Sequence, residues 1–187
     1  VGIWSHIAET SDEDDDLSRA AFLEAIRIAE DVGLRPQVRH LAASAAAFAR
    51  PEFRFDLVRF GAFSYGIRST GGPELEGIAP AATLIATVSD VGDSAVAVSY
   101  GYLDGLPSTL AGRMSVGTPA GPRLVREIGP ATMLIDPWPG AAVEDEVYLF
   151  GPGTRGESSV TTLAEAIGTV GEEIIVHPGI LVPQANP

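Results

Sequence analysis

The chain has 187 residues, 45% of them hydrophobic and 20% charged, which is typical of a globular protein with one domain or two small ones. A formal net charge of -13 disfavours nucleic acid and anionic lipid as partners. The sequence contains twelve arginines but no lysine and no cysteine, which excludes disulfides and any reaction that begins at a lysine amine of this chain. We see no membrane-spanning run or export signal and expect a cytoplasmic protein.

The first third of the chain alternates between predicted strands and helices. We expect strands at 3–7, 38–41 and 57–63, a helix after the acidic run 11–16, and a short helix at 44–49. The acidic run favours a helix N-terminus, with an acidic binding tail as the alternative. The long helix should end at Gly33 and bury the residues that recur at helical spacing: Leu17, Ala21, Ala25, Ile28, Ala29 and Val32. This alternation predicts a parallel sheet with site residues at its strand ends.

A turn-rich connector at 69–74 precedes a second region in which Gly and Pro separate β-branched runs. We expect strands at 83–91, 95–102, 128–136, 146–150 and 174–176. A capping box from Thr162 to Glu165 predicts a short helix that ends at Ile167. The predicted organisation is an α/β region over residues 1–70 and a mostly β domain over residues 76–187.

Several motifs, taken in order and spacing, resemble the latter part of the alanine racemase family. They are Ser5-His6-Ile7-Ala8, His40-Leu41-Ala42-Ala43-Ser44-Ala45-Ala46, Val58-Arg59-Phe60-Gly61-Ala62-Phe63-Ser64-Tyr65-Gly66, Gly101-Tyr102-Leu103-Asp104-Gly105, Asp145-Glu146-Val147-Tyr148-Leu149-Phe150-Gly151 and Gly168-Thr169-Val170-Gly171-Glu172-Glu173-Ile174. The similarity covers almost all of this chain but only about the last half of the family. It implies an α/β + β protein: the C-terminal β/α portion of a (β/α)8 TIM-like barrel, then a mostly β C-terminal domain.

The resemblance also implies a cofactor, pyridoxal 5'-phosphate, and a homodimer. Tyr102 would act on the substrate across the dimer interface, on the face opposite a Schiff-base lysine that this chain lacks. His6 and Arg59 would form a hydrogen-bonded line that supports the phenolate of Tyr102, since a fixed cation favours the charged form of a nearby phenol. Arg59 would also face the ring nitrogen of the cofactor. Arginine donates but does not accept hydrogen bonds, so the nitrogen would remain unprotonated.

For the cofactor phosphate, the resemblance implies donors at Ser44, Gly61 and Ala62, and for the substrate carboxylate a backbone contact at Met133. The chain departs from the family pattern around these positions. Ala43 stands where an asparagine is usual, and the tail at 181–186 lacks the tyrosine that reaches the phosphate. The segment Gly129-Pro130-Ala131-Thr132-Met133-Leu134 lacks the arginine and aspartate that normally flank the methionine.

The three residues with an implied catalytic role, Tyr102, Arg59 and His6, also have a purely structural interpretation. Tyr102 fits an amphipathic turn residue with its hydroxyl in water. Arg59 fits a salt-bridged surface residue, and His6 a hydrogen-bonded histidine of the barrel.

The function indicated is a PLP-dependent amino-acid racemase, interconverting L- and D-alanine for cell-wall precursors. The lysine would lie outside this chain, so the chain alone is expected to be inactive and marginally stable. The alternative is a non-catalytic, degenerate racemase-like module for binding or dimerisation. A D-amino-acid aldolase of the same fold is disfavoured, because three scattered histidines and no cysteine make a poor metal site.

Overall fold

The computed structural model describes residues 1–8, 11–68 and 76–181. The chain divides into two compact units, Val1–Phe63 and Ser64–Pro187. The connector expected at 69–74 and the tail at 182–186 lie outside the described residues. No helix in the described part of the chain is long and apolar enough to cross a membrane.

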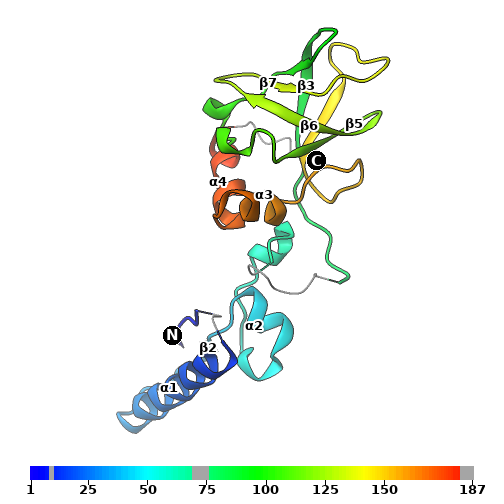
Figure 1. The fold of residues 1–187 in the computed structure, drawn as a ribbon. Helices are drawn as coiled ribbons and strands as arrows, with labels where there is room; N and C mark the ends of the chain where they lie inside the picture. The colour runs from blue at the N-terminus through cyan, green and yellow to red at the C-terminus, as the bar shows by residue number, and fades with distance from the viewer. Residues whose placement is uncertain (9–10, 69–75, 182–187) are drawn as a thin grey trace. The chain divides into compact units, whose positions relative to one another are not determined.

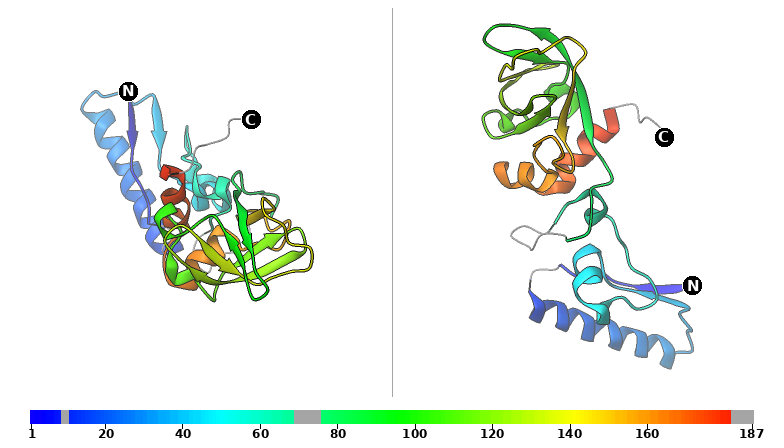
Figure 2. Two further views of the ribbon diagram at one scale, coloured as in Figure 1. Left: turned by 90° about the horizontal axis from the view of Figure 1, so that it is seen from above. Right: turned by 90° about the vertical axis from the view of Figure 1, so that its right-hand side faces the viewer.

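The first unit is a small α/β structure built on two parallel strands. β1 (Gly2–Trp4) pairs with β2 (Val38–His40), and Trp4 lies opposite His40 in the register. The helical elements are α1 (Asp12–Asp31), α2 (Ser44–Ala49), η1 (Pro51–Phe53) and the start of η2 (Ala62–Tyr65). α1 lies along one face of the strand pair, as Figures 1 and 2 show, and Ile7, Phe22 and Phe53 are among the buried core residues there. The α/β class expected for this region is confirmed.

The ends of α1 follow from local sequence. Ser11 is the N-cap, and its hydroxyl accepts the N–H of Asp14 at 3.2 Å. Four acidic residues occupy the first turn, where the partial positive charge of the helix N-terminus stabilises them. Gly33, just beyond the helix, has φ of +86°, a conformation that glycine adopts without steric cost. The acidic run is therefore a helix start, as expected.

The face of α1 that packs inward differs from the expectation. Phe22 and Ile26 are buried, whereas Leu17, Ile28 and Val32 are 65%, 52% and 71% exposed. α1 carries apolar residues on both faces, so helical spacing alone does not say which face is buried. Contact with the sheet decides it.

The strand expected at 57–63 is not present in the structure. The segment does run beside β2, because the N–H groups of Asp56 and Arg59 donate to the carbonyl oxygens of Arg39 and Ala42. However, Phe55 has a positive φ of 48°, and the Asp56 carboxylate binds both the N–H and the guanidinium of Arg39. A turn at Phe55 and side-chain hydrogen bonds to Arg39 thus take the place of regular backbone pairing between this segment and β2.

The second unit contains a closed antiparallel barrel, with strands in the order β3-β4-β7-β6-β5-β8. The strands are β3 (Leu84–Val91), β4 (Val96–Val98), β5 (Ser115–Thr118), β6 (Gly121–Ile128), β7 (Met133–Ile135) and β8 (Glu146–Phe150). Fully buried side chains fill it, among them Val88, Val98, Met133, Ile135 and Leu149. Closure removes the unpaired strand edges that an open sheet would leave. The mostly β architecture expected here is confirmed.

Helical elements accompany the barrel: η3 (Tyr102–Asp104), η4 (Ser108–Leu110), α3 (Val160–Ile167) and α4 (Gly171–Leu181). α3 and α4 lie side by side near one end of the barrel (Figure 1). The N-cap of α3 is Ser159, three residues before the expected cap at Thr162. The strand expected at 174–176 is wrong, because this segment lies within α4. Ile174 is buried there, and a three-residue apolar run does not distinguish strand from helix.

A buried carboxylate orders the loop between β8 and α3. Glu157 is 5% exposed, and its side chain accepts the backbone N–H groups of Gly153, Thr154 and Arg155 at 2.8 to 3.1 Å. Three donated bonds compensate for the loss of hydration that a buried charge suffers. Glu157 therefore holds the backbone of residues 153–155 in place.

Candidate functional site

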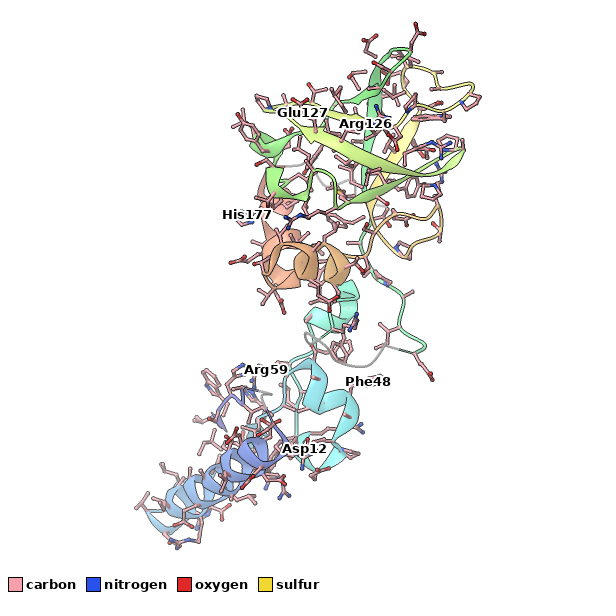
Figure 3. The ribbon with its side chains drawn as sticks, in the orientation of Figure 1. Asp12, Phe48, Arg59, Arg126, Glu127 and His177 are labelled. Carbon is pink, nitrogen blue, oxygen red and sulfur yellow. The ribbon has the colours of Figure 1, made fainter. Side chains whose placement is uncertain are left out.

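Arg59 is the centre of the candidate site in the first unit. Its Nη1 lies 2.9 Å from Nδ1 of His40, and its Nη2 lies 2.7 Å from Nδ1 of His6 and 3.1 Å from the carbonyl oxygen of Leu41. A guanidinium has five N–H donors. The described residues use three of them, which leaves the Nε–H and one N–H of Nη1 for other acceptors. Figure 3 shows the Arg59 side chain beside the β1–β2 pair.

Both histidines face Arg59 through Nδ1. Because arginine only donates hydrogen bonds, each of these Nδ1 atoms is the acceptor in its contact. The ends of β1 and β2 bring both histidines to Arg59, as expected for polar residues at the ends of parallel strands. His6 and Arg59 were predicted site residues, whereas His40 was not.

Trp4 adds an aromatic wall to the same cluster. Its ring is parallel to that of His40, with 5.9 Å between centroids and 3° between planes. The guanidinium carbon of Arg59 lies 5.8 Å from the centroid of the Trp4 ring. Trp4 was not among the predicted site residues. Its place directly opposite His40 in the strand register could be recognised only after the pairing was known.

The groups expected to bind a phosphate also lie together. The N–H of Gly61 donates to the hydroxyl oxygen of Ser44 at 3.1 Å, and the Ser44 side chain is buried at the start of α2. Ala62 follows Gly61 at the start of η2. Ala43 occupies the N-cap position of α2 and makes no side-chain cap bond. This part of the site thus has a buried hydroxyl that is bonded to the Gly61 N–H, and no side-chain amide at residue 43.

Tyr102 lies in a tightly packed turn of the second unit. Its N–H donates to the carbonyl oxygen of Gly129 at 2.9 Å, and the Asp104 carboxylate accepts the N–H of Gly101 at 2.8 Å. A Cβ on Gly101 would lie 2.4 Å from the carbonyl oxygens of Gly129 and Pro130, so only glycine fits there. The Tyr102 side chain is 46% exposed and thus accessible.

Tyr100, two residues earlier, has the opposite environment. Its side chain is buried, and its hydroxyl donates to the carbonyl oxygen of Asp104 at 2.7 Å. Burial, with a smaller effect from the charge of Asp104, raises the pKa of Tyr100 to about 12. Tyr100 therefore stays protonated and supports the turn that carries Tyr102.

Met133 lies on β7, between β4 and β6. It pairs with Val98 on one side and Ile128 on the other, and its side chain is fully buried in the barrel. The backbone contact between Met133 and a substrate therefore stays a prediction, and the buried side chain would not take part in it.

Comparisons of sequence and of structure both match this chain to alanine racemases. A family model described as "Alanine racemase, N-terminal domain" matches residues 1–69. Over 98% of this chain, the sequence is 34% identical to an alanine racemase of Thermobifida fusca and 36% identical to one of Streptomyces coelicolor. A solved structure of alanine racemase from Streptomyces coelicolor matches 98% of the chain with a TM-score of 0.85 and 31% identity. The chain is thus similar to alanine racemases over almost its whole length. It spans about half the length of these relatives, covering 56% and 54% of the two sequences and 55% of the solved chain, and corresponds to their C-terminal part.

The predicted site residues fall in both units of the chain. The first unit brings together His6 and Arg59, and separately Ser44 and Gly61. Tyr102 and Met133 belong to the second unit. The described residues contain no group of three or more His, Cys, Asp or Glu side chains that could hold a metal ion.

Proposed function

We propose that the chain forms the C-terminal part of a pyridoxal-phosphate-dependent alanine racemase. One observation carries the proposal: Arg59 is held by two histidines and a backbone carbonyl and keeps an Nε–H donor for a further acceptor. The ring nitrogen of pyridoxal phosphate is such an acceptor. Arginine stays protonated in proteins, so Arg59 would donate a hydrogen bond to this nitrogen without giving up its proton.

The phosphate of the cofactor would bind at the Ser44 hydroxyl and the backbone amides of Gly61 and Ala62. The adjacent positions of Ser44 and Gly61 support this assignment. Ala43 lacks the side-chain donor that an asparagine would add, which weakens the site by about 1 kcal/mol net. When bound, the cofactor supplies an electron-withdrawing ring that lowers the cost of removing the α-proton from an amino acid. This chain has no lysine, so the amine that would hold the cofactor aldehyde has to come from another segment.

Racemisation requires two proton-transfer groups, one on each face of the α-carbon. Tyr102 would be the group on one face, acting on the substrate bound by the partner subunit of a homodimer. Its side chain is exposed, and the closely packed backbone at Gly101 holds the turn that carries it, which suits this role. The backbone at Met133 would contact the carboxylate of L- or D-alanine. The product, D-alanine, would serve cell-wall precursor synthesis in the cytoplasm.

The first experiment is cofactor binding by the full-length protein. Pyridoxal phosphate is added, borohydride is used to reduce any adduct to a lysine, and mass spectrometry locates the product. Arg59→Ala should weaken cofactor binding about tenfold or more, because a bond from a charged donor is lost. Arg35→Ala is the matched control, since Arg35 is an exposed arginine of the same unit that bonds backbone carbonyls of Glu30 and Leu34. If no cofactor is trapped, the chain is better described as a non-catalytic binding or dimerisation module.

A further inference from the structure

Trp4 is a large aromatic residue that does not pack into the core of the first unit. Its side chain is 64% exposed, whereas its neighbour Ile3 packs against the buried cluster shared with α1. Side chains alternate along a strand, so Trp4 lies on the sheet face opposite that cluster. Among the described residues, the ring contacts of Trp4 are with His40 and Arg59.

The pairing of β1 and β2 makes Trp4 and His40 cross-strand neighbours on this face. Their rings are parallel within 3° at a centroid distance of 5.9 Å, which is an offset stack. A ring stacked in this way has one fixed plane. Since the Nδ1 lone pair of His40 lies in that plane, the stack also sets the direction from which the ring can accept a hydrogen bond.

Arg59 depends on that direction. Its Nη1 donates to Nδ1 of His40, while its Nη2 is shared between His6 and the carbonyl oxygen of Leu41. The guanidinium is planar and rigid, so bonds at two of its nitrogens fix the orientation of the remaining donors. The indole of Trp4, at 5.8 Å, adds a cation–π contact to the same group.

We propose that Trp4 and His40 together are positioning residues for Arg59: the Trp4 ring holds His40 in the plane from which it binds the guanidinium. This inference rests on the proposed function, in which Arg59 meets the cofactor ring. Neither residue needs to touch the cofactor or the substrate for this effect. Their contribution is to fix the plane of the guanidinium, and with it the directions of the remaining donors, the Nε–H and one N–H of Nη1.

The test uses the full-length protein and a titration with pyridoxal phosphate, followed by absorbance. Trp4→Leu should weaken cofactor binding about two- to fivefold, because His40 loses the stacked ring that holds the plane from which it binds Arg59. Trp4→Phe should largely restore binding, because it keeps an aromatic face. Phe48→Leu is the control: Phe48 is a half-exposed ring of the same unit, seen in Figure 3, whose ring contact is with Phe63.

A double substitution separates positioning from independent effects. If the two residues act as one clamp, adding Trp4→Leu to His40→Gln should weaken binding by less than twofold beyond His40→Gln alone. Fully additive effects, or unchanged binding in folded Trp4→Leu, would overturn the proposal. Crystal structures provide the readout that does not depend on the cofactor: Trp4→Leu should lose the 2.9 Å contact between Arg59 and His40. If that contact is lost but the wild-type protein binds no cofactor, positioning stands and the proposed function fails.

Discussion

The N–H of Tyr102 donates to the carbonyl oxygen of Gly129, and this bond ties the turn that carries the tyrosine to the turn between β6 and β7. Gly101 makes the approach of the two turns possible, because it has no side chain. Position 101 therefore controls where the Tyr102 hydroxyl lies.

Gly101→Ala should displace Tyr102 and destabilise the second unit by about 1–3 kcal/mol, since the added Cβ meets two carbonyl oxygens. Denaturant unfolding and racemase assays of the full-length protein would measure both effects. Gly61→Ala serves as the comparison for stability, because a Cβ there meets nothing within 4 Å. Equal stability of the two variants would contradict the account of position 101.

Tyr102→Phe should impair proton exchange on one face of alanine more than on the other, because it removes the hydroxyl and keeps the ring. The measurement is incorporation of solvent deuterium into L-alanine and into D-alanine by the full-length protein. We expect one direction to fall at least tenfold further than the other, in line with the loss of a general acid–base group. A symmetric fall in both directions would argue that Tyr102 has a structural role only.

The raised pKa of Tyr100 predicts a stability change at alkaline pH. Its folded-state pKa of about 12 lies above the ordinary value of 10.0, so the folded state favours the neutral phenol. This contribution is fully present below pH 10 and is lost as the pH rises towards 12. Absorbance titration of the phenols should show a group ionising near pH 12 that disappears in Tyr100→Phe. If the titration curve of Tyr100→Phe keeps that late group, the assignment is wrong.

Glu157→Ala should destabilise the chain by roughly 2–4 kcal/mol, because three backbone N–H groups lose their buried acceptor. Glu144, which is exposed on another loop, gives a control in Glu144→Ala. Thermal unfolding of both variants would reveal the difference. A wild-type midpoint for Glu157→Ala would show that water replaces the carboxylate without loss.

Two isoleucines of α1 test which face of the helix is buried. Ile26→Ala should cost about 2–4 kcal/mol, as is usual for a buried aliphatic side chain, while Ile28→Ala should stay within about 0.5 kcal/mol. Chemical unfolding followed by circular dichroism provides the comparison. The reverse order would support the face inferred from sequence spacing.

Local sequence predicted the helix α1, whose ends carry recognisable capping residues. Ser11 and the acidic first turn mark the start of α1, and Gly33 follows its end. The β-branched segments at β3 and β8 were also expected. The errors at 57–63 and 174–176 have a common cause: short apolar segments take their structure from the surfaces they pack against. β5 and β6 were missed because their positions depend on barrel closure.

The sequence alone determined the kinds of groups available to this protein: arginines between apolar residues, histidines near predicted strand ends, a tyrosine in a glycine-bounded turn motif and no lysine. The order of its motifs also indicated the alanine racemase family. Tertiary structure decided which of these groups meet. The parallel pairing of β1 with β2 places Trp4 and His6 beside His40 and Arg59, although 53 residues separate His6 from Arg59. Such contacts come from strand pairing and shared core burial, which bring together residues that no local pattern connects.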